Sequence, residues 1–260
     1  IKMVQHLMPH SHDYKVGQRE IYGNIFHPTT KPDFMFTKLL TEFPEGNLDD
    51  SYNFKVGEDD CEVNIFSFDD NVKILYHLTP PEFVFTEEEY ELLDDAKRIM
   101  SEHKPSKEEF VDPARMREVF FNIGKDMLTD LAQHQNLRIK DEKMSQLAQA
   151  LLRHTVGFGL IELLLSDPKV QDVNVNSPNG ALPVFIVHQD YGDCYTNIYP
   201  TILEVESWAT KLRLISGRPL DEANPILDTE LKVEGFTSRV SALTAPLSPT
   251  GLAFSFRRHR

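Results

Sequence analysis

The chain has 260 residues, of which 40% are apolar and 26% are charged, a balance typical of globular proteins rather than disordered ones. This length predicts one large domain or two ordinary ones, with enough residues to bury a core. The net charge of −14 argues against a general nucleic-acid-binding protein, because the field of the whole chain would repel phosphate.

The cysteine pattern and the apolar runs indicate where the protein works. Cys61 and Cys194 form no motif, which is typical of the reducing cytosol. No apolar run approaches the about 20 residues of a transmembrane helix, and the start of the chain lacks a secretory signal pattern. We therefore expect a cytoplasmic protein that serves a membrane only from its surface. Because the first residue is Ile1 rather than Met, we also expect a fragment of a longer protein.

The first sixty residues mix prolines and phenylalanines without a clear period, and we predict irregular structure with short helices or strands there. Three histidines, His6, His10 and His12, lie close together in this region. Histidines without a second cluster of ligands are more often exposed side chains than metal ligands. We therefore predict no metal site.

A β-hairpin and then a small helical bundle are predicted between residues 62 and 155. Apolar residues alternate with polar ones on both sides of a turn at residues 69–71, as in a hairpin. Three amphipathic helices follow, one capped by Thr86, one starting with Pro113 at its first position, and one running from Asp141 to about Thr155. Their apolar stripes are interpreted as core packing between helices.

The pattern changes at Gly157-Phe158-Gly159, where glycines permit a sharp change of backbone direction. A short helix over 160–165 and three strands over 170–175, 184–188 and 194–199 are expected next. A helix over 203–215, capped by Gly217, then precedes two strands over 238–244 and 252–256. The predicted class is α+β, with an N-terminal domain over 1–155 and an α/β domain over 156–260. One continuous sheet through both halves would contradict this division.

Five segments of the second half carry a resemblance to a known family. They are Gly157-Phe158-Gly159-Leu160-Ile161-Glu162-Leu163-Leu164-Leu165-Ser166-Asp167-Pro168; Thr196-Asn197-Ile198; Ser216-Gly217-Arg218-Pro219-Leu220 with Asn224-Pro225-Ile226-Leu227-Asp228; Ser238-Arg239-Val240; and Phe256-Arg257-Arg258. In this order they resemble motifs of archaeal type II/type IV secretion-superfamily ATPases. No single match is specific, whereas five in the family's order are. The resemblance is weaker over residues 62–155 and absent before residue 60.

The resemblance implies a homohexameric ring at the cytoplasmic face of the membrane, which uses ATP and Mg²⁺ to power secretion or the assembly of pili or archaeal flagella. It also implies a polytopic membrane platform protein as partner. The domain over 156–260 would be PAS-like, and would cover the nucleotide held by a C-terminal RecA-like motor.

The same resemblance implies roles for four arginines. Arg239 and Arg257 match the catalytic arginine positions best, and Arg218 and Arg258 are further candidates for contacting the nucleotide. A guanidinium suits this role because its planar fork of donors stays charged and fits phosphate oxygens. A surface salt bridge is the alternative for each of the four.

The motor itself is not found in this sequence. No Gly-x-x-x-x-Gly-Lys-Ser/Thr loop occurs, since Gly124-Lys125-Asp126 lacks the upstream glycine and the hydroxyl residue. We therefore expect the full protein to hydrolyse ATP, and this chain alone to be inactive and to hold no cofactor. The alternative function is a non-enzymatic adaptor that docks the membrane platform protein. No cofactor-ligating motif favours a third possibility, a PAS-type sensor of small molecules.

Overall fold

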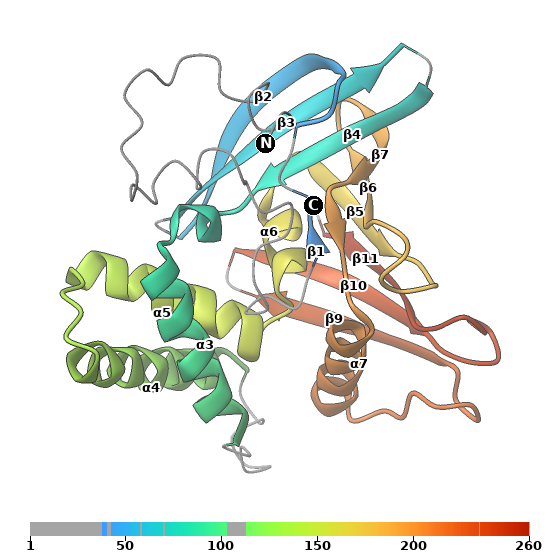
Figure 1. The fold of residues 1–260 in the computed structure, drawn as a ribbon. Helices are drawn as coiled ribbons and strands as arrows, with labels where there is room; N and C mark the ends of the chain where they lie inside the picture. The colour runs from blue at the N-terminus through green and yellow to red at the C-terminus, as the bar shows by residue number, and fades with distance from the viewer. Residues whose placement is uncertain are drawn as a thin grey trace, which may run out of the picture.

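The computed structural model describes residues 38–40, 43–57, 59–69, 71–102, 113–233 and 235–259. His6, His10 and His12 lie outside these residues. The fold combines helices with a large mixed sheet, so the predicted α+β class is confirmed (Figure 1). No single described helix is long and apolar enough to cross a membrane. The helices Asp141–Thr155 and Leu160–Ser166 satisfy that test only as a pair with a 105° bend between them.

A nine-stranded sheet forms the centre of the molecule. Every neighbouring pair is antiparallel except β4 and β7, which are parallel. In spatial order, the strands are β2 (Asn47–Val56), β3 (Asp59–Phe68), β4 (Asn71–Thr79), β7 (Gly192–Thr196), β6 (Phe185–His188), β5 (Val170–Val175), β11 (Ala253–Arg258), β10 (Phe236–Leu243) and β9 (Ile226–Val233). A separate two-stranded sheet pairs β1 (Lys38–Leu39) with β8 (Ile198–Tyr199).

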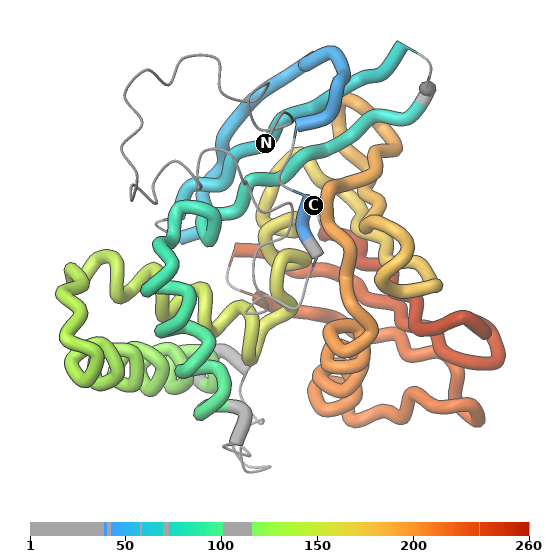
Figure 2. Tube along the Cα trace, in the orientation of Figure 1, coloured from blue at the N-terminus to red at the C-terminus, as the bar shows by residue number. Residues whose placement is uncertain are grey.

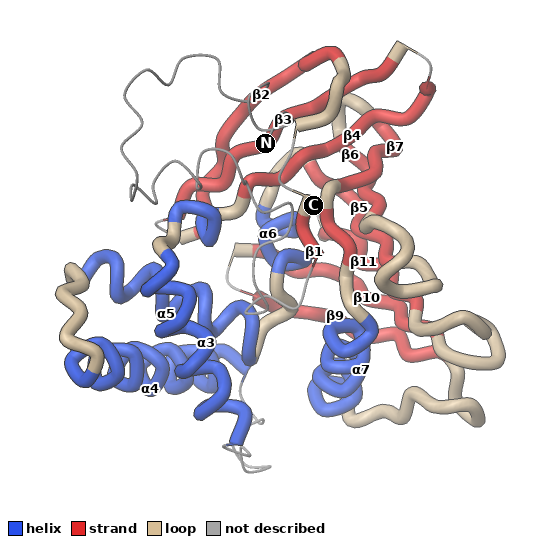
Figure 3. Tube along the Cα trace, viewed as in Figure 1, coloured by secondary structure: helices blue, strands red, loops and turns tan. Residues whose placement is uncertain are grey.

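The described helices, which are blue in Figure 3, fall into two groups. Three of them pack on one another as the predicted bundle, namely α3 (Glu87–Glu102), α4 (Pro113–His134) and α5 (Asp141–Thr155). The other two, α6 (Leu160–Ser166) and α7 (Ile202–Ser216), pack on the strands of the second half. A short 3-10 helix, η2 (Pro81–Val84), connects β4 to α3.

Local capping signals explain why these helices begin and end where they do. Thr86 accepts a hydrogen bond from the backbone of Glu89, whose carboxylate accepts one from the Thr86 backbone in return, a capping box at the start of α3. Pro113 is the first residue of α4, as predicted. Gly217 ends α7 with a φ of 65°, the left-handed cap predicted for it.

The bend between α5 and α6 depends on the two glycines of the Gly157-Phe158-Gly159 segment. Gly159 has a φ of 59° and a ψ of −137°, a conformation that only glycine adopts easily. A Cβ atom on Gly157 would lie 2.5 Å from Glu162 Oε1 and 2.7 Å from the Arg153 carbonyl oxygen. The predicted change of backbone direction is therefore confirmed. The packing around residue 157 requires glycine there, because it leaves no room for a side chain.

The sheet crosses the predicted boundary between the two halves. Strand β4 of the N-terminal hairpin pairs with β7, with Ile74 opposite Cys194 and Tyr76 opposite Thr196. Figure 2 shows the cyan strand β4 lying beside the orange strand β7. The expectation that the halves would have separate sheets is wrong, because the edge of β4 that β3 leaves open is completed by β7. Whether residues 1–155 and 156–260 fold separately stays a prediction.

One strand and one break were not predicted. Strand β2 lies in the region where irregular structure with short helices or strands was predicted, whereas β9 follows Pro225, where no strand was expected. The strand predicted over 194–199 is divided into β7 and β8 at Asn197. The side-chain amide of Asn197 bonds to the backbone N–H and carbonyl of Leu78 and to the Leu40 carbonyl, so it fills the break.

Candidate functional site

Strands β5, β9, β10 and β11 have one covered face and one open face. Buried residues alternate with exposed ones along β10, where Ser238, Val240 and Ala242 point inward. On the covered face, the Phe254 ring lies 5.9 Å from Trp208 of α7, and the Phe256 ring lies 6.3 Å from Phe158. The alternation leaves polar side chains on the opposite face of these four strands.

Two of the predicted arginines are direct neighbours on the open face. The strand register places Arg239 of β10 opposite Arg257 of β11. Like charges that face each other across an antiparallel pair destabilise a sheet, so the fold gains nothing from this arrangement. The register extends the row to Glu230 of β9 beside Arg239, and to Asp172 of β5 beside Arg257. The row therefore has two cations at its centre and one carboxylate at each end.

The two arginines differ in their bonding. Arg257 forms a two-point salt bridge with Asp172, with Nε 2.7 Å from Oδ1 and Nη2 3.4 Å from Oδ2. These hydrogen bonds raise the pKa of Arg257 above its ordinary value, so it stays cationic. Arg239 is exposed and has no hydrogen bond or ion pair with any other described residue. Together they offer two adjacent guanidinium groups, a donor set that fits phosphate oxygens.

The other two predicted arginines lie elsewhere. Arg258 follows Arg257 in the strand and therefore points to the other face, where its Nη1 donates to the Asp167 carbonyl oxygen at 2.7 Å. Arg218, just after α7, donates to the Asp228 carbonyl oxygen at 3.2 Å. The structure thus brings Arg239 and Arg257 together, and it engages Arg258 and Arg218 with backbone carbonyls at separate places.

Sequence reasoning missed the two carboxylates of the row. Asp172 could have been found from the pattern in Val170–Val175, because the three valines are buried and the polar residues between them are not. Glu230 could not be found, because no strand was predicted around it. The lysine of Gly124-Lys125-Asp126 lies within α4, and its Nζ is 2.9 Å from Asp141 Oδ1, so this segment is part of a helix rather than a phosphate-binding loop.

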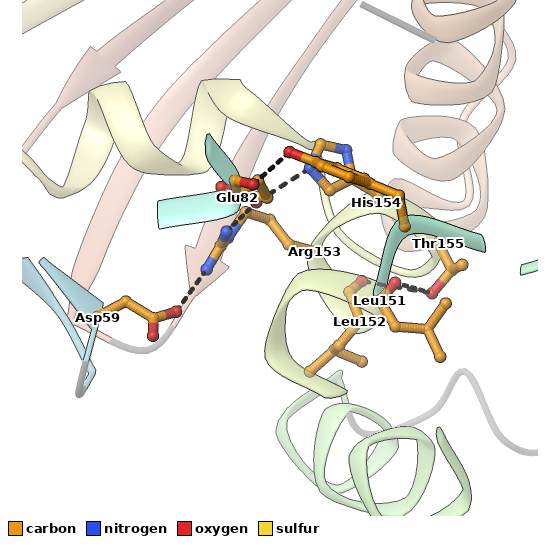
Figure 4. Close-up of polar contacts among 8 residues, drawn as sticks. Asp59, Glu82, Leu151, Leu152, Arg153, His154 and Thr155 are labelled. Atoms are coloured by element: carbon orange, nitrogen blue, oxygen red, sulfur yellow. Dashed lines mark hydrogen bonds and ion pairs between the residues drawn. The ribbon is translucent and has the colours of Figure 1, made fainter. Parts of the chain in front are cut away.

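A buried ionic cluster lies at the junction of η2, α5 and β3 (Figure 4). The Arg153 guanidinium contacts the carboxylates of Glu82 and Asp59, and His154 Nε2 lies 3.2 Å from Glu82 Oε1. Although burial opposes ionisation, Arg153 and His154 hold the pKa of Glu82 at about 2. Burial lowers the pKa of His154, so this imidazole is neutral at pH 7. The cluster is buried and joins η2, α5 and β3.

The structure also has a groove, which is separate from the arginine row. A groove of about 600 Å³ lies between α7 and the loop over 244–252, and its lining includes Thr210, Arg213, Ser248 and Leu220. Neither Arg239 nor Arg257 lines it. Among the described residues, no group of three or more histidine, cysteine or acidic side chains is arranged to hold a metal ion.

Comparison with known proteins gives archaeal relatives. No family model matches the chain. Three uncharacterized proteins of Methanocaldococcus jannaschii are similar to it. The first is 31% identical to this chain, over 52% of this chain and 18% of the relative's length. The second is 26% identical, over 62% of this chain and 62% of the relative's length. The third is 30% identical, over 47% of this chain and 21% of the relative's length. The chain thus spans less than two thirds of each of these relatives, and only about a fifth of two of them.

One solved structure is similar to part of the chain. It is the VirB11 ATPase from the Brucella suis type IV secretion system, in complex with sulphate. The match has 17% identity and a TM-score of 0.32, and it covers 38% of this chain and 28% of that one. A likeness of this size does not establish a common fold. The archaeal origin of the relatives agrees with the archaeal branch named by the sequence resemblance.

Proposed function

We propose that this chain is the N-terminal, nucleotide-facing part of an ATP-driven secretion-superfamily ATPase, in which Arg239 and Arg257 contact the phosphates of a nucleotide held by a motor domain. The observation that carries the proposal is the cross-strand pairing of these two arginines on an open sheet face. The sequence resemblance selected the same two residues without knowledge of their register.

The chemistry of phosphoryl transfer gives the pair its role. Negative charge spreads over the oxygens of the transferred phosphoryl group, and cationic donors aimed at those oxygens lower the barrier. Two guanidinium groups on adjacent strands can meet such a group together, and the salt bridge with Asp172 already orders one of them. Because none of the described helices packs on the open face, a motor domain can approach there and supply the phosphate-cradling loop and Mg²⁺.

The proposal extends to the assembly. A ring of six copies at the inner face of the cell membrane, docked on a polytopic platform protein, follows from the resemblance alone. Size measurement of the full-length protein with ATP and Mg²⁺, and co-sedimentation with membranes that contain the platform protein, would test these two parts.

The test of the arginine roles uses the full-length protein. Arg239→Ala and Arg257→Ala should each lower ATP turnover by about 10³-fold or more, as expected when an arginine finger is removed. Because both side chains are exposed, each substitution should lower the free energy of unfolding by only about 0.5 kcal/mol. Near-normal ATP turnover in either variant would show that the substituted arginine is a surface charge and does not contact the phosphates.

Arg258→Ala is the internal comparison. Its guanidinium is bonded to the Asp167 carbonyl on the covered side, so its removal should affect stability more than turnover. A larger loss of turnover in Arg258→Ala than in Arg257→Ala would move the catalytic assignment by one residue. Arg218→Ala serves in the same way for the contact proposed after α7.

A further inference from the structure

The salt bridge between Arg257 and Asp172 uses only one edge of the guanidinium. Nε and one N–H of Nη2 face the carboxylate. A guanidinium has five N–H donors in a fixed plane, so both N–H groups of Nη1 and one of Nη2 stay free. The carboxylate therefore fixes the plane of Arg257 without using the outer edge that would face an incoming oxyanion.

The burial of the two partners supports this division of roles. The Asp172 side chain is 15% exposed, whereas the Arg257 side chain is 74% exposed. The carboxylate thus belongs to the sheet surface, and the guanidinium extends from it towards solvent. An arginine held at its base in this way has lost much of its rotamer freedom before any ligand binds.

The two ends of the row are not equivalent. Asp172 bonds to the arginine beside it, whereas Glu230 contacts Lys232 at 3.1 Å and His259 at 3.9 Å and has no ion pair with Arg239. Both carboxylates add the same negative charge next to the arginine pair. Only Asp172 also fixes the orientation of its neighbour, so charge and orientation can be tested separately.

We propose that Asp172 is a positioning residue, which holds Arg257 beside Arg239 so that a polyphosphate oxyanion can bridge the two guanidinium groups. This inference rests on the function proposed above. It assigns a role to a carboxylate that, by charge alone, would oppose anion binding. Positioning predicts that loss of the Asp172 charge weakens anion binding, whereas simple electrostatics predicts that it strengthens binding.

The experiment titrates the 260-residue chain with inorganic pyrophosphate at constant ionic strength and follows NMR signals of β10, β11 and the arginine Nε–H groups. Asp172→Asn and Glu230→Gln are matched variants, since each removes one negative charge from the row without changing side-chain size. Asp172→Asn should raise the dissociation constant about 3- to 10-fold, because Arg257 must then be ordered on binding. Glu230→Gln should leave binding equal or tighter.

Two further measurements keep the test decisive. In the ligand-free chain, the Arg257 Nε–H signal should be sharp and slow to exchange, and Asp172→Asn should remove it. Arg257→Lys keeps the charge but cannot form the two-point contact, so it should weaken binding like Asp172→Asn, and combining the two should add little. If Asp172→Asn fails to fold, Arg257→Lys alone carries the comparison with Glu230→Gln.

The failures of the two proposals are distinguishable. Tighter pyrophosphate binding by Asp172→Asn, with normal binding by the wild type, would make Asp172 a competitor and overturn this inference while leaving the proposed function in place. Absence of any pyrophosphate-dependent shift at Arg239 and Arg257 in the wild type would also overturn this inference. The proposed function, in which a motor domain holds the nucleotide, would fall only if Arg239→Ala and Arg257→Ala left the ATP turnover of the full-length protein near normal.

Discussion

Tyr76 and Asp167 are 91 residues apart in sequence and are joined by a hydrogen bond of 2.8 Å in the interior of the protein. Tyr52 donates to the same carboxylate oxygen at 2.6 Å, and the Lys169 backbone N–H donates to the other oxygen at 2.9 Å. Burial, followed by the Asp167 charge, raises the pKa of Tyr76, so its hydroxyl remains a donor. The Asp-Pro end of α6 is therefore a second point, besides the pairing of β4 with β7, where the N-terminal hairpin is attached to the second half.

We expect Tyr76→Phe to lower the free energy of unfolding by about 1.5–3 kcal/mol, the usual effect of losing a hydrogen bond to a charged group. Asp167→Ala should cost more, about 2–5 kcal/mol, because it leaves the buried Tyr76 hydroxyl without its acceptor and removes one of the partners of the Tyr52 hydroxyl. The Tyr52 hydroxyl also lies 3.0 Å from His188 Nε2, so it keeps that partner. Denaturant unfolding measures both. Tyr195→Phe is the control, since its hydroxyl has no hydrogen bond among the described residues. If Tyr195→Phe lowered the free energy of unfolding as much as Tyr76→Phe does, the hydrogen bond to Asp167 would not be what stabilises the protein.

Gly159→Ala should destabilise the chain by about 1–3 kcal/mol, because the backbone there has a φ of 59° and a ψ of −137°, which alanine adopts only with strain. Thermal unfolding of the variant is the measurement. Gly57→Asn is the matched control, because Gly57 has a φ of 63° and open space around it, and asparagine tolerates that conformation. A normal melting temperature in Gly159→Ala would mean that the α5–α6 bend can relax.

The helices were predicted well because their limits are set by residues next to them in sequence. Thr86, Pro113, Asp141 and Gly217 each lie at the helix end that they were predicted to mark. These signals act through backbone groups within one turn, so no tertiary information is needed.

The strands at the two edges of the sheet could not be predicted in the same way. Strand β2 contains Asp49, Asp50 and Asn53, residue types that are uncommon in strands, and most of its length is exposed. Only its pairing with β3 makes it a strand. The break at Asn197 likewise depends on distant backbone groups of Leu40 and Leu78, so no local pattern could show it.

The candidate site was predictable as two residues but not as an arrangement. Resemblance selected Arg239 and Arg257, but their contact depends on the register of β10 with β11, which a slip of one residue would destroy. The same register separates Arg258 from the pair, because adjacent residues of a strand point to opposite faces. Asp172 enters the site only because β5 pairs with β11 on its other side.

Stability should fall as the pH falls below about 6.5, the unfolded value for histidine. Burial lowers the pKa of His77 in the folded chain, so below that pH the unfolded chain binds a proton that the folded chain does not. The His77 ring packs against the rings of Phe43 and Phe66, and neither of its nitrogens has a hydrogen-bond partner among the residues that the structure describes. Replacement of His77 should therefore remove part of the acid sensitivity.

The variant is His77→Phe, which keeps the ring contacts and cannot titrate. Between pH 7 and pH 5, the free energy of unfolding should change less steeply than in the wild type, by at most about 1.4 kcal/mol per pH unit for one proton. His154 and His188, whose pKa values burial also lowers, should account for the remaining slope. Phe66→Leu alters the same packing without removing a titrating group, so it should lower stability equally at both pH values. An unchanged slope in His77→Phe would show that this histidine does not contribute.

The final prediction concerns whether residues 156–260 fold without the N-terminal hairpin. In the whole chain, β4 covers one edge of β7, and Tyr52 and Tyr76 cover the Asp167 carboxylate. A fragment of residues 156–260 would expose this strand edge, a site for mispairing and aggregation, and would leave Asp167 without two of its donors. We expect this fragment to unfold without a cooperative transition, or with a midpoint far below that of the whole chain.

Two longer fragments are the controls for this prediction. A fragment of residues 43–260, which retains the hairpin, should unfold cooperatively. A fragment of residues 113–260, which keeps α4 and α5 but lacks the hairpin, should behave like the fragment of residues 156–260. Circular dichroism and amide NMR of the three fragments make the comparison. If residues 156–260 alone give the same dispersed amide spectrum as in the whole chain and melt within a few degrees of it, the two-domain division at residues 155 and 156 holds, and the strand pairing between β4 and β7 is a contact between independent domains rather than part of one core.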